Sequence, residues 1–407
     1  MDLFFKDAIK QTQNIERKVE QVGNLNISVV GVGGCGNNII NWISKQKVQG
    51  AKIFALNTDQ QHLNRVEADE KLLIGKTVTR GLGCGGNPLK GEEAARESSL
   101  EIKEMVNKRD IVFVITGNGG GTGSGAAPVV AELARKSGSL VFGVATMPFN
   151  MERLRVEKAE VALLKLKDNC DCLIVIDNNK LTEIAGSMPL GQAFNVANNL
   201  ISTMVKGLIE TITVPSLINL DYADLKAIAT NSGIASIGVG SSNTKNRVVE
   251  AVNQAINNPL LEVDYDGATG ALINIQGGPE MTLEEVNNAI KMITQKMDKD
   301  ANVIFGAKID EKFKGQFVVM SIITGLKSTW DIKKEQKNDS FFHSLDIDTL
   351  KKEKFEELSK QVEIRVDNKP KIKEERKVFT SVDYESLDLS DDDDDLMDES
   401  LEIQILN

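Results

Sequence analysis

A loop built almost entirely from glycine is the feature that most constrains how this chain can fold. It runs from Gly117 to Gly125 and follows a short apolar segment, Ile111 to Ile115, that is typical of a buried strand. An alanine-rich helix with Pro128 in its first turn is expected next. Glycine lets the backbone approach a bulky anion, and a helix N-terminus adds roughly half a positive charge. The segment predicts an oligophosphate site, with a flexible glycine–serine linker as the alternative.

Backbone amides must do most of the binding in such a site. No lysine follows the last glycine, so the loop lacks the Gly-Lys-Ser/Thr ending of the common phosphate-binding motif. Two further glycine-rich turns occur at Gly31 to Gly36 and at Gly81 to Pro88. Three such turns at the C-terminal ends of parallel strands suit one mononucleotide triphosphate. The GxGxxG spacing of Gly31 to Gly36, with Asp59 further on, favours a Rossmann oxidoreductase as the alternative.

The composition excludes several classes of function. The 407-residue chain has a net charge of −11, whereas a general nucleic-acid binder needs a basic face. Its apolar runs are shorter than the roughly 18 residues of a membrane span. It has two histidines, and its four cysteines form no paired Cys-x-x-Cys units, which argues against zinc and against Ser-His-Asp chemistry. We therefore expect no metal ion held by direct protein ligands.

Strand-like and helix-like segments divide the chain into five expected parts. An N-terminal extension at 1–24 precedes a doubly wound parallel α/β domain at 25–189. A long helix from Leu190 to Ile212 begins the third part, 190–223, and its wide apolar face should lie between two domains. A smaller α+β domain at 224–326 follows. Residues 327–407 are strongly charged and include Asp391 to Asp395, which predicts a disordered linker and tail.

Local patterns also predict the individual elements. The expected strands are 27–32, 52–56, 111–115, 140–144 and 173–176 in the first domain, and 270–276, 303–309 and 317–323 in the second. In the second domain, helices are expected at 248–256 and 283–297.

Ordered motifs along most of the chain resemble those of one known family. They are Gly119-Gly-Gly-Thr-Gly-Ser-Gly125, Asn57-Thr-Asp59, Thr79-Arg-Gly-Leu-Gly83, Thr146-Met-Pro-Phe149, Asn219-Leu-Asp-Tyr-Ala-Asp224 and Asp266-Gly-Ala-Thr-Gly-Ala-Leu272. From Gly31 to about Gly325 the chain resembles FtsZ, the tubulin-like GTPase of prokaryotic cell division, and its archaeal members most closely. The resemblance implies GTP and GDP as ligands, with Mg²⁺ held mainly by the phosphates and K⁺ as a further candidate.

The resemblance also implies roles for residues of the nucleotide site. The phosphates would be held by Gly33, Gly34, Cys35, Gly36, Asn37, Asn38, Gly119, Gly120, Gly121, Thr122, Gly123 and Ser124, with Asp59 and Gly85 as neighbouring candidates. Thr146, Glu152 and Arg155 would approach the ribose and the nearby phosphates, and Asn178, Phe194 and Asn198 would hold the nucleoside. The residues alone leave a plainer interpretation open, in which Phe194 is core and Asn198 is a satisfied buried polar group.

Two aspartates have two interpretations. Asp221 and Asp224 precede an apolar run, which by itself is a helix N-cap signal. In the FtsZ family the matching aspartates position the water that attacks the γ-phosphate. At about 1.5 Å per residue, the long helix places them on the order of 30 Å from Phe194 and Asn198. They could therefore act only on a neighbour's nucleotide, through a head-to-tail contact that builds a filament.

Several positions depart from the family pattern. Cys35 and Cys84 stand where small residues are usual, through steric tolerance or as a redox-sensitive feature of the site. A one-residue deletion after Glu152 places the family arginine on Arg155, whereas an ungapped alignment would place Val156 there. Asp177 replaces the usual proline, and Tyr222 replaces phenylalanine.

The expected function is that of a GTP-hydrolysing, self-assembling protein of the cytoplasmic division ring at mid-cell. A low-turnover scaffold with a role in cell shape is the alternative. The alternation of Leu401, Ile403 and Ile405 predicts a strand added to the sheet edge of a membrane tether or division regulator, unless the acidic tail only aids solubility.

Overall fold

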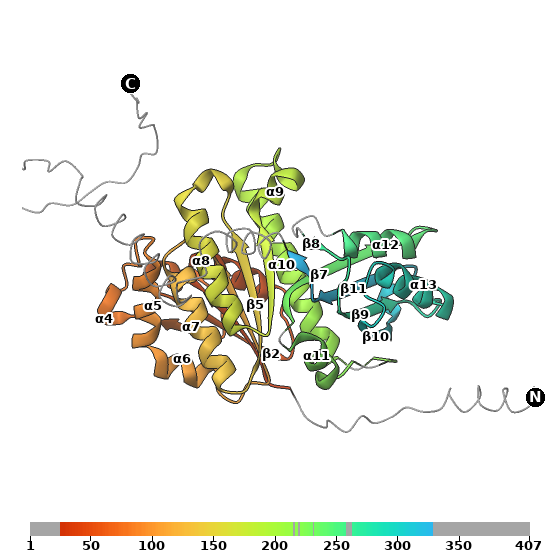
Figure 1. The fold of residues 1–407 in the computed structure, drawn as a ribbon, viewed down its shortest axis with the longest axis horizontal. Coiled ribbons are helices and arrows are strands. Elements are labelled where there is room, and N and C mark those ends of the chain that lie inside the picture. Colours follow the sequence, from red (N-terminus) through yellow and green to blue (C-terminus); the bar gives the residue numbers. More distant parts are fainter. Residues whose placement is uncertain (1–24, 215, 219, 231, 258–262, 329–407) are drawn as a thin grey trace, which may run out of the picture. The chain divides into compact units, whose positions relative to one another are not determined.

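The computed structural model describes residues 25–328 apart from 215, 219, 231 and 258–262 (Figure 1). The expectations for residues 1–24 and for the tail beyond 328 lie outside this part of the chain. Among the described residues, ten strands form one sheet in the order β10-β9-β11-β7-β6-β5-β4-β1-β2-β3. Their bounds are β1 Ile27–Val32, β2 Ala51–Asn57, β3 Glu70–Leu73, β4 Ile111–Gly117, β5 Leu140–Met147, β6 Cys172–Asp177, β7 Gly233–Ser242, β9 Gly270–Gly277, β10 Asn302–Ile309 and β11 Phe317–Thr324.

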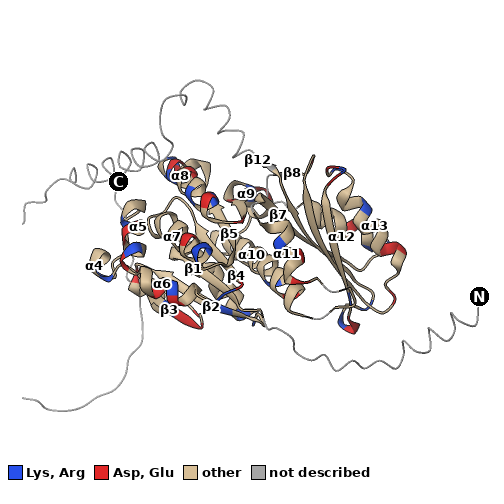
Figure 2. Cartoon of the chain, turned by 60° about the horizontal axis from the view of Figure 1, so that its bottom comes forward, with Lys and Arg blue, Asp and Glu red and all other residues tan. Residues whose placement is uncertain are grey.

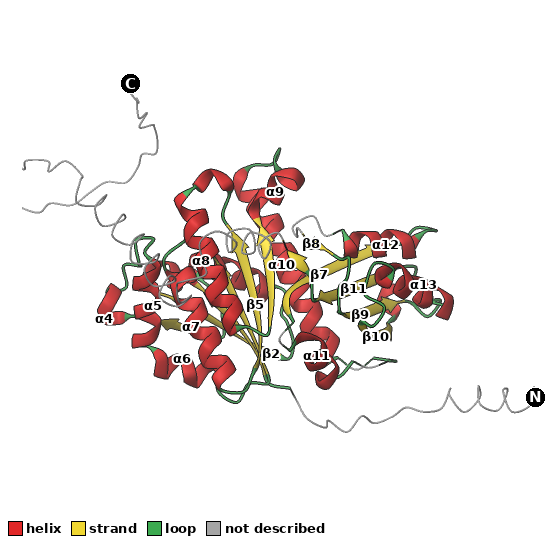
Figure 3. Cartoon of the chain, viewed as in Figure 1, coloured by secondary structure: helices red, strands yellow, loops and turns green. Residues whose placement is uncertain are grey.

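Helices cover both faces of the sheet (Figure 3). They are α2 Gly33–Lys45, α3 Gln60–Arg65, α4 Lys76–Thr79, α5 Pro88–Glu97, α6 Ser99–Val106, α7 Thr122–Lys136, α8 Leu154–Asn169, α9 Asn178–Ala185, α10 Leu190–Thr213, α11 Tyr222–Ala229, α12 Arg247–Ile256 and α13 Leu283–Thr294. A two-stranded sheet pairs β8 Val263–Asp264 with β12 Lys327–Ser328. The predicted strands of both domains are confirmed to within two residues at each end, except that β5 runs three residues further than expected, to Met147. Helix α13 ends three residues earlier than expected.

Strand alternation sorts the buried side chains into two cores, one on each face of the first half of the sheet. Val29, Phe113 and Phe142 point to the face covered by α2 and α10. Val30 and Val112 point to the opposite face, where α5, α6, α7 and α8 pack. This is the period of two expected of strands that are buried on both sides. Figure 2 shows charged residues on helices, loops and edge strands, while β1, β4 and β5 carry none.

Helix α10 packs on both halves of the sheet, as its wide apolar face predicts. Ile201, Val205 and Leu208 share one buried cluster with α2 and with the first strands. The same cluster includes Leu272 of β9 and Ile322 of β11. Nearby, the amide of Asn274 donates a hydrogen bond to the hydroxyl of Thr211 on α10 at 2.8 Å. The helix therefore ties the two halves together.

Strands β3 and β7 were absent from the sequence-based expectations. β7 pairs in parallel with β6 and antiparallel with β11, so it makes the sheet continuous. β7 was not predicted because its glycines interrupt the pattern of branched apolar residues that is typical of a strand. A Cβ atom at Gly238 would lie 1.6 Å from the carbonyl oxygen of Ala255, and one at Gly240 would lie 1.9 Å from that of Ala251. The glycines are required because α12 packs directly against the β7 backbone.

The start of α7 also differs from the expectation. The helix begins at Thr122, inside the glycine-rich segment, so Pro128 lies within the helix and not in its first turn. The physical reason is close packing of α7 against α5. A Cβ atom at Gly125 would lie 2.0 Å from the carbonyl oxygen of Pro88, so this glycine is needed inside the helix. Similarly, β1 passes straight into α2 at Gly33, without the loop expected there.

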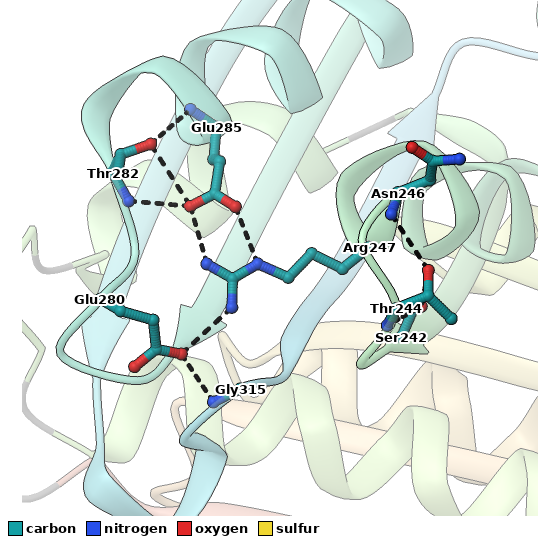
Figure 4. Close-up of polar contacts among 8 residues, drawn as sticks. All are labelled: Ser242, Thr244, Asn246, Arg247, Glu280, Thr282, Glu285 and Gly315. Carbon is teal, nitrogen blue, oxygen red and sulfur yellow. Dashed lines mark hydrogen bonds and ion pairs between the residues drawn. The ribbon is translucent and has the colours of Figure 1, made fainter.

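An ion-pair cluster joins α12 to α13 (Figure 4). Arg247 Nε donates to Glu285 Oε1 at 2.7 Å, and Arg247 Nη2 donates to Glu285 Oε2 at 2.9 Å. Arg247 Nη1 also donates to Glu280 Oε1 at 3.1 Å. Glu285 in addition closes a capping box with Thr282 at the start of α13. The arginine side chain is only 14% exposed, so these bonds are better shielded than those of a surface pair.

We expect Arg247→Met to lower the free energy of unfolding by about 1–3 kcal/mol, because it leaves a partly buried carboxylate without its partner. The hydrogen bond from Arg247 is the main cause that lowers the pKa of Glu285. A lowered folded-state pKa adds stability above the unfolded value of about 4.3, and this stability is lost as the pH falls through the folded value. Urea unfolding should therefore give a lower free energy of unfolding for Glu285→Gln than for wild type at pH 7. In acid, below the folded-state pKa of Glu285, the two values should be equal.

Lys136→Met is the matched control. Lys136 pairs with Glu132, but its side chain is 70% exposed, so its removal should cost less than about 1 kcal/mol. Equal losses for Arg247→Met and Lys136→Met would contradict a special contribution from the cluster.

Candidate functional site

The carboxyl ends of four adjacent parallel strands lie at one edge of the sheet. The register pairs Val32 of β1 with Thr116 of β4, Gly117 of β4 with Thr146 of β5, and Met147 of β5 with Asp177 of β6. The predicted site segments start directly after these positions. In this half of the sheet the strand order is 3-2-1-4-5-6, and it reverses between β1 and β4, where ligands of doubly wound folds bind.

Two helix N-termini meet at that point. A Cβ atom at Gly33, the first residue of α2, would lie 2.8 Å from the backbone nitrogen of Gly123, in the first turn of α7. Neither helix has a side-chain hydrogen bond at its N-cap. By contrast, Asp59 caps α3 and Asn87 caps α5. Because the first N–H groups of α2 and α7 receive no cap, they are available to an anion, which both helix dipoles would favour.

Threonine and cysteine side chains join the turns around these N-termini. Thr58, after β2, lies 2.7 Å from the hydroxyl of Thr122 and 3.3 Å from the sulfur of Cys84. The sulfur of Cys35 lies 3.3 Å from the hydroxyl of Thr146 on β5. Cys84 is buried, so the Gly81–Pro88 turn packs directly on the α7 segment. The structure thus brings together all three glycine-rich turns that the sequence singled out.

The thiol of Cys35 lies beside the carboxyl ends of β4 and β5, next to Gly117 and Thr146. Solvent reaches the residue, and partial desolvation by the neighbouring protein raises the pKa of the Cys35 thiol. A cysteine held as the neutral thiol is a poor nucleophile. Gly117 has no room for a side chain, because a Cβ atom there would lie 2.4 Å from the Cβ of Cys35. These contacts favour the steric interpretation of Cys35 over the redox one.

Gly34, Gly36, Asn37 and Asn38 lie in the first turns of α2, and Gly119 to Ser124 span the end of the β4 turn and the start of α7. Gly36 packs on the backbone of β4, since a Cβ atom would lie 2.3 Å from the carbonyl oxygen of Ile115. Gly119 donates its N–H to the hydroxyl of Ser124 at 2.8 Å. Asn37 is buried and donates to the carbonyl of Leu56 at 3.2 Å, so it positions α2 on β2.

Other predicted residues gather at the β5 and β6 ends of the same edge. The rings of Phe149 and Phe194 meet edge to face at 6.2 Å. Glu152 accepts from the N–H of Phe149 at 3.0 Å and pairs with Arg155 at 2.5 Å. Phe194 is 38% exposed, so the alternative that it is a core residue is wrong. An exposed aromatic ring beside a partner ring can stack on a nucleobase.

Asn178 begins α9, and the departure at Asp177 has a clear local role. The Asp177 side chain accepts from the backbone N–H of Asn179 at 2.8 Å and from its amide at 2.7 Å. The side-chain oxygen of Asn179 then accepts from the N–H of Asn150 at 2.9 Å. This chain of bonds links the β6–α9 turn to the β5–α8 turn. Asn198 lies one helical turn beyond Phe194 on α10 and is partly exposed.

Asp59 and Gly85, two of the predicted site residues, differ from the others in their surroundings. The carboxylate of Asp59 accepts from the N–H of His62 at 3.0 Å and so acts as a helix cap. Gly85 has a φ of +57° and nothing within 4 Å of a Cβ position. His62 was not among the predicted site residues, but its ring nitrogen would lie 3.9 Å from a Cβ atom at Gly34. Its position in the helix that Asp59 caps could have indicated that it lies near the site.

Asp221 and Asp224 lie at the opposite edge of the sheet. Asp221 Oδ1 accepts from the N–H of Asp224 at 2.8 Å, and Asp224 Oδ2 accepts from the N–H of Asp221 at 3.1 Å, so the capping interpretation is confirmed. The hydroxyl of Tyr222 donates to the carbonyl of Asp110, just before β4 begins, at 3.3 Å. At about 3.3 Å per residue, β4 separates this turn from the glycine-rich edge by roughly 20 Å. In Figure 1, α9 lies at the top of the view and α11 near the bottom.

The Tubulin/FtsZ family GTPase-domain model matches residues 26–186, and the FtsZ-family C-terminal-domain model matches residues 233–327. Cell division protein FtsZ 2 of Methanocaldococcus jannaschii is 48% identical over 335 residues, which are 82% of this chain and 88% of that protein. The chain belongs to the FtsZ family. FtsZ 1 of the same organism is 50% identical over 303 residues, covering 74% of this chain and 83% of that protein.

A solved structure, "FtsZ dimer, empty" of M. jannaschii, has a TM-score of 0.70 at 46% identity and covers 80% of this chain and 96% of that chain. The GTPγS-bound protofilament of CetZ2 from Haloferax volcanii has a TM-score of 0.66 at 19% identity, which shows the shared fold alone. This FtsZ-family chain is therefore a tubulin-like GTPase that binds GTP and GDP. The Rossmann oxidoreductase alternative is wrong, although the strand order alone could not have excluded it.

Among the residues that the structure describes, no helix is both long enough and apolar enough to cross a membrane. The same residues contain no group of three or more His, Cys, Asp or Glu side chains placed to hold a metal ion.

Proposed function

We propose that this chain assembles head to tail into filaments of a division ring and hydrolyses GTP where two subunits meet. The proposal depends on one observation: the glycine-rich turns and the Asp221 turn lie at opposite edges of the sheet. Uncapped helix N-termini lie at one edge and the Asp221 turn at the other. Since the two edges of one subunit cannot meet, a complete site needs a second copy, and repetition of such a heterologous contact forms a filament.

In this arrangement the first turns of α2 and α7 bind the phosphates through backbone N–H groups, which no side chain caps. Glu152 and Arg155 lie toward the ribose, and Asn178, Phe194 and Asn198 toward the guanine. Mg²⁺, held mainly by the phosphates, would neutralise the charge that develops on the transferred group, and K⁺ is a further candidate. Asp221 and Asp224 of the adjoining subunit orient the attacking water.

A capping role does not prevent this chemistry. A carboxylate has about four lone-pair sites, and each of these caps uses one. Asp221 is exposed and thus accessible to a neighbouring subunit. The exposed Leu217, at 71%, and Ile218, at 39%, lie just before it and offer apolar surface to the same contact.

The deciding experiment measures phosphate release per subunit over a wide range of protein concentration. The proposal expects almost none in dilute protein and a steep rise once sedimentation with GTP detects polymer. An equal rate per subunit at all concentrations would refute the shared site. A low rate even in fully sedimented protein would favour the scaffold alternative.

We also propose the five-part division of the chain at 24, 189, 223 and 326, and a cytoplasmic location at the mid-cell ring. Deletion of Thr380 to Asn407 should leave GTPase activity and sedimentation unchanged but abolish binding to a membrane tether or regulator. Fluorescence imaging of the ring in cells is the measurement. Normal ring placement by the truncated protein would leave the tail only a solubilising role.

A further inference from the structure

A buried lysine next to the glycine-rich segment is not used by the function proposed above. Lys158, on α8, is only 7% exposed, and its ammonium donates to the carbonyl of Gly86 at 2.7 Å. Burial, and after it the positive charge of Arg155, lowers the pKa of Lys158. A buried cation held by a neutral carbonyl is costly, so its placement needs a compensating use.

The turn that Lys158 holds forms one side of the proposed phosphate site. Cys84 and Asn87 lie against Gly121, where a Cβ atom would be 2.6 Å from the Cβ of Cys84 and 3.0 Å from the nitrogen of Asn87. On the other side, Gly85 and Gly86 have nothing within 4 Å of their Cβ positions. The Cβ sides of these two glycines therefore face open space.

The same helix also contacts the glycine-rich segment two residues before Gly121. A Cβ atom at Gly119 would lie 2.8 Å from the carbonyl oxygen of Arg155, one helical turn before Lys158. The first turns of α8 thus touch Gly119 directly and reach the Gly81–Pro88 turn through Lys158. This geometry lets one helix set the spacing between the two segments.

We propose that Lys158 is a positioning residue that holds the Cys84–Asn87 turn closed against the α7 segment and thereby shapes the phosphate site. The effect on phosphate binding rests on the proposed function, but the claim that Lys158 holds the turn can be tested without nucleotide. The lysine also adds positive charge beside a site that lacks the usual phosphate-loop lysine.

The first test measures alkylation of each cysteine in folded, nucleotide-free protein by mass spectrometry. Cys84 is buried where the turn packs on Gly121 and Thr122, so Lys158→Met should speed its modification by roughly tenfold or more, the value of a charge-assisted hydrogen bond. Cys170 and Cys172 are buried at the end of α8 and the start of β6, and they report any general loosening.

Lys165→Met is the matched control. Lys165 lies two turns further along α8 and pairs with Glu92 at 2.9 Å, so its loss should leave Cys84 at the wild-type rate. An unchanged Cys84 rate in Lys158→Met would overturn the proposal. A parallel rise at Cys170 and Cys172 would overturn it too, because the lysine would then support the whole domain.

The second test measures GTP affinity in dilute, unassembled protein. Lys158→Met should bind GTP roughly tenfold more weakly, while Lys165→Met should match wild type. Faster alkylation with unchanged affinity would overturn the link to the phosphate site. Failure of the wild-type protein to bind GTP would instead count against the proposed function, so the two failures are distinguishable.

Discussion

Asp221→Asn is expected to lower GTP turnover at least a hundredfold while GTP affinity stays within a few-fold of wild type. Removal of a group that orients or activates a nucleophile costs roughly 10²–10⁴ in rate. Asparagine is as good an N-cap as aspartate, so α11 should remain capped through the N–H of Asp224. Phosphate release at a concentration where the protein sediments is the measurement, with nucleotide affinity determined separately by equilibrium binding.

Asp221→Ala separates capping from catalysis. It removes the cap as well and should cost about 1 kcal/mol in the free energy of unfolding, whereas Asp221→Asn should cost little. Equal turnover in wild type and Asp221→Asn would show that the carboxylate only caps the helix. A parallel loss of GTP affinity would point to a structural role.

Gly120→Asp is expected to abolish GTP binding without unfolding the protein. No atom lies within 4 Å of a Cβ position at Gly120, and its φ is not positive, so a side chain fits. A carboxylate about 4 Å from a phosphate charge costs about 4 kcal/mol at an effective dielectric of about 20, which is nearly a thousandfold in affinity. Equilibrium binding of GTP measures the loss, and urea unfolding checks the fold.

Gly120→Asn is the isosteric neutral control and should bind GTP within about tenfold of wild type. If the neutral and charged variants lose equal affinity, side-chain bulk explains the effect, and the electrostatic account of the site fails.

Together the two variants test whether the site is shared. The Gly120→Asp variant keeps Asp221 and Asp224 but should not bind GTP. The Asp221→Asn variant should bind GTP but lacks the Asp221 carboxylate. A mixture that sediments together should recover phosphate release that neither protein shows alone. No recovery in a co-sedimenting mixture would argue that each subunit acts on its own nucleotide.

Most strands of the fold could be predicted from short apolar runs because burial on both faces leaves a strong local signal. β7 could not, since Gly238 and Gly240 are dictated by the approach of α12, which lies later in the chain. The start of α7 was misplaced for the same reason. Glycine at position 125 signals a loop by local propensity, but contact with α5 requires it inside a helix.

The candidate site divides in the same way. Glycine-rich turns could be recognised because their chemistry depends on the local backbone. Lys158 gave no signal in the sequence, because a lysine on a charged helix is usually solvated. Only the arrangement of α8 beside the Gly81–Pro88 turn makes it a buried contact.

Local sequence was sufficient for the alternation of strands and helices, the three glycine-rich turns and the capping signal at Asp221. These properties depend on residues that are neighbours in the chain. The tertiary structure alone decided that two uncapped helix N-termini converge, that the ten strands form one continuous sheet, and which glycines pack against other elements. These features depend on residues far apart in sequence, whose contacts exist only when the chain has folded.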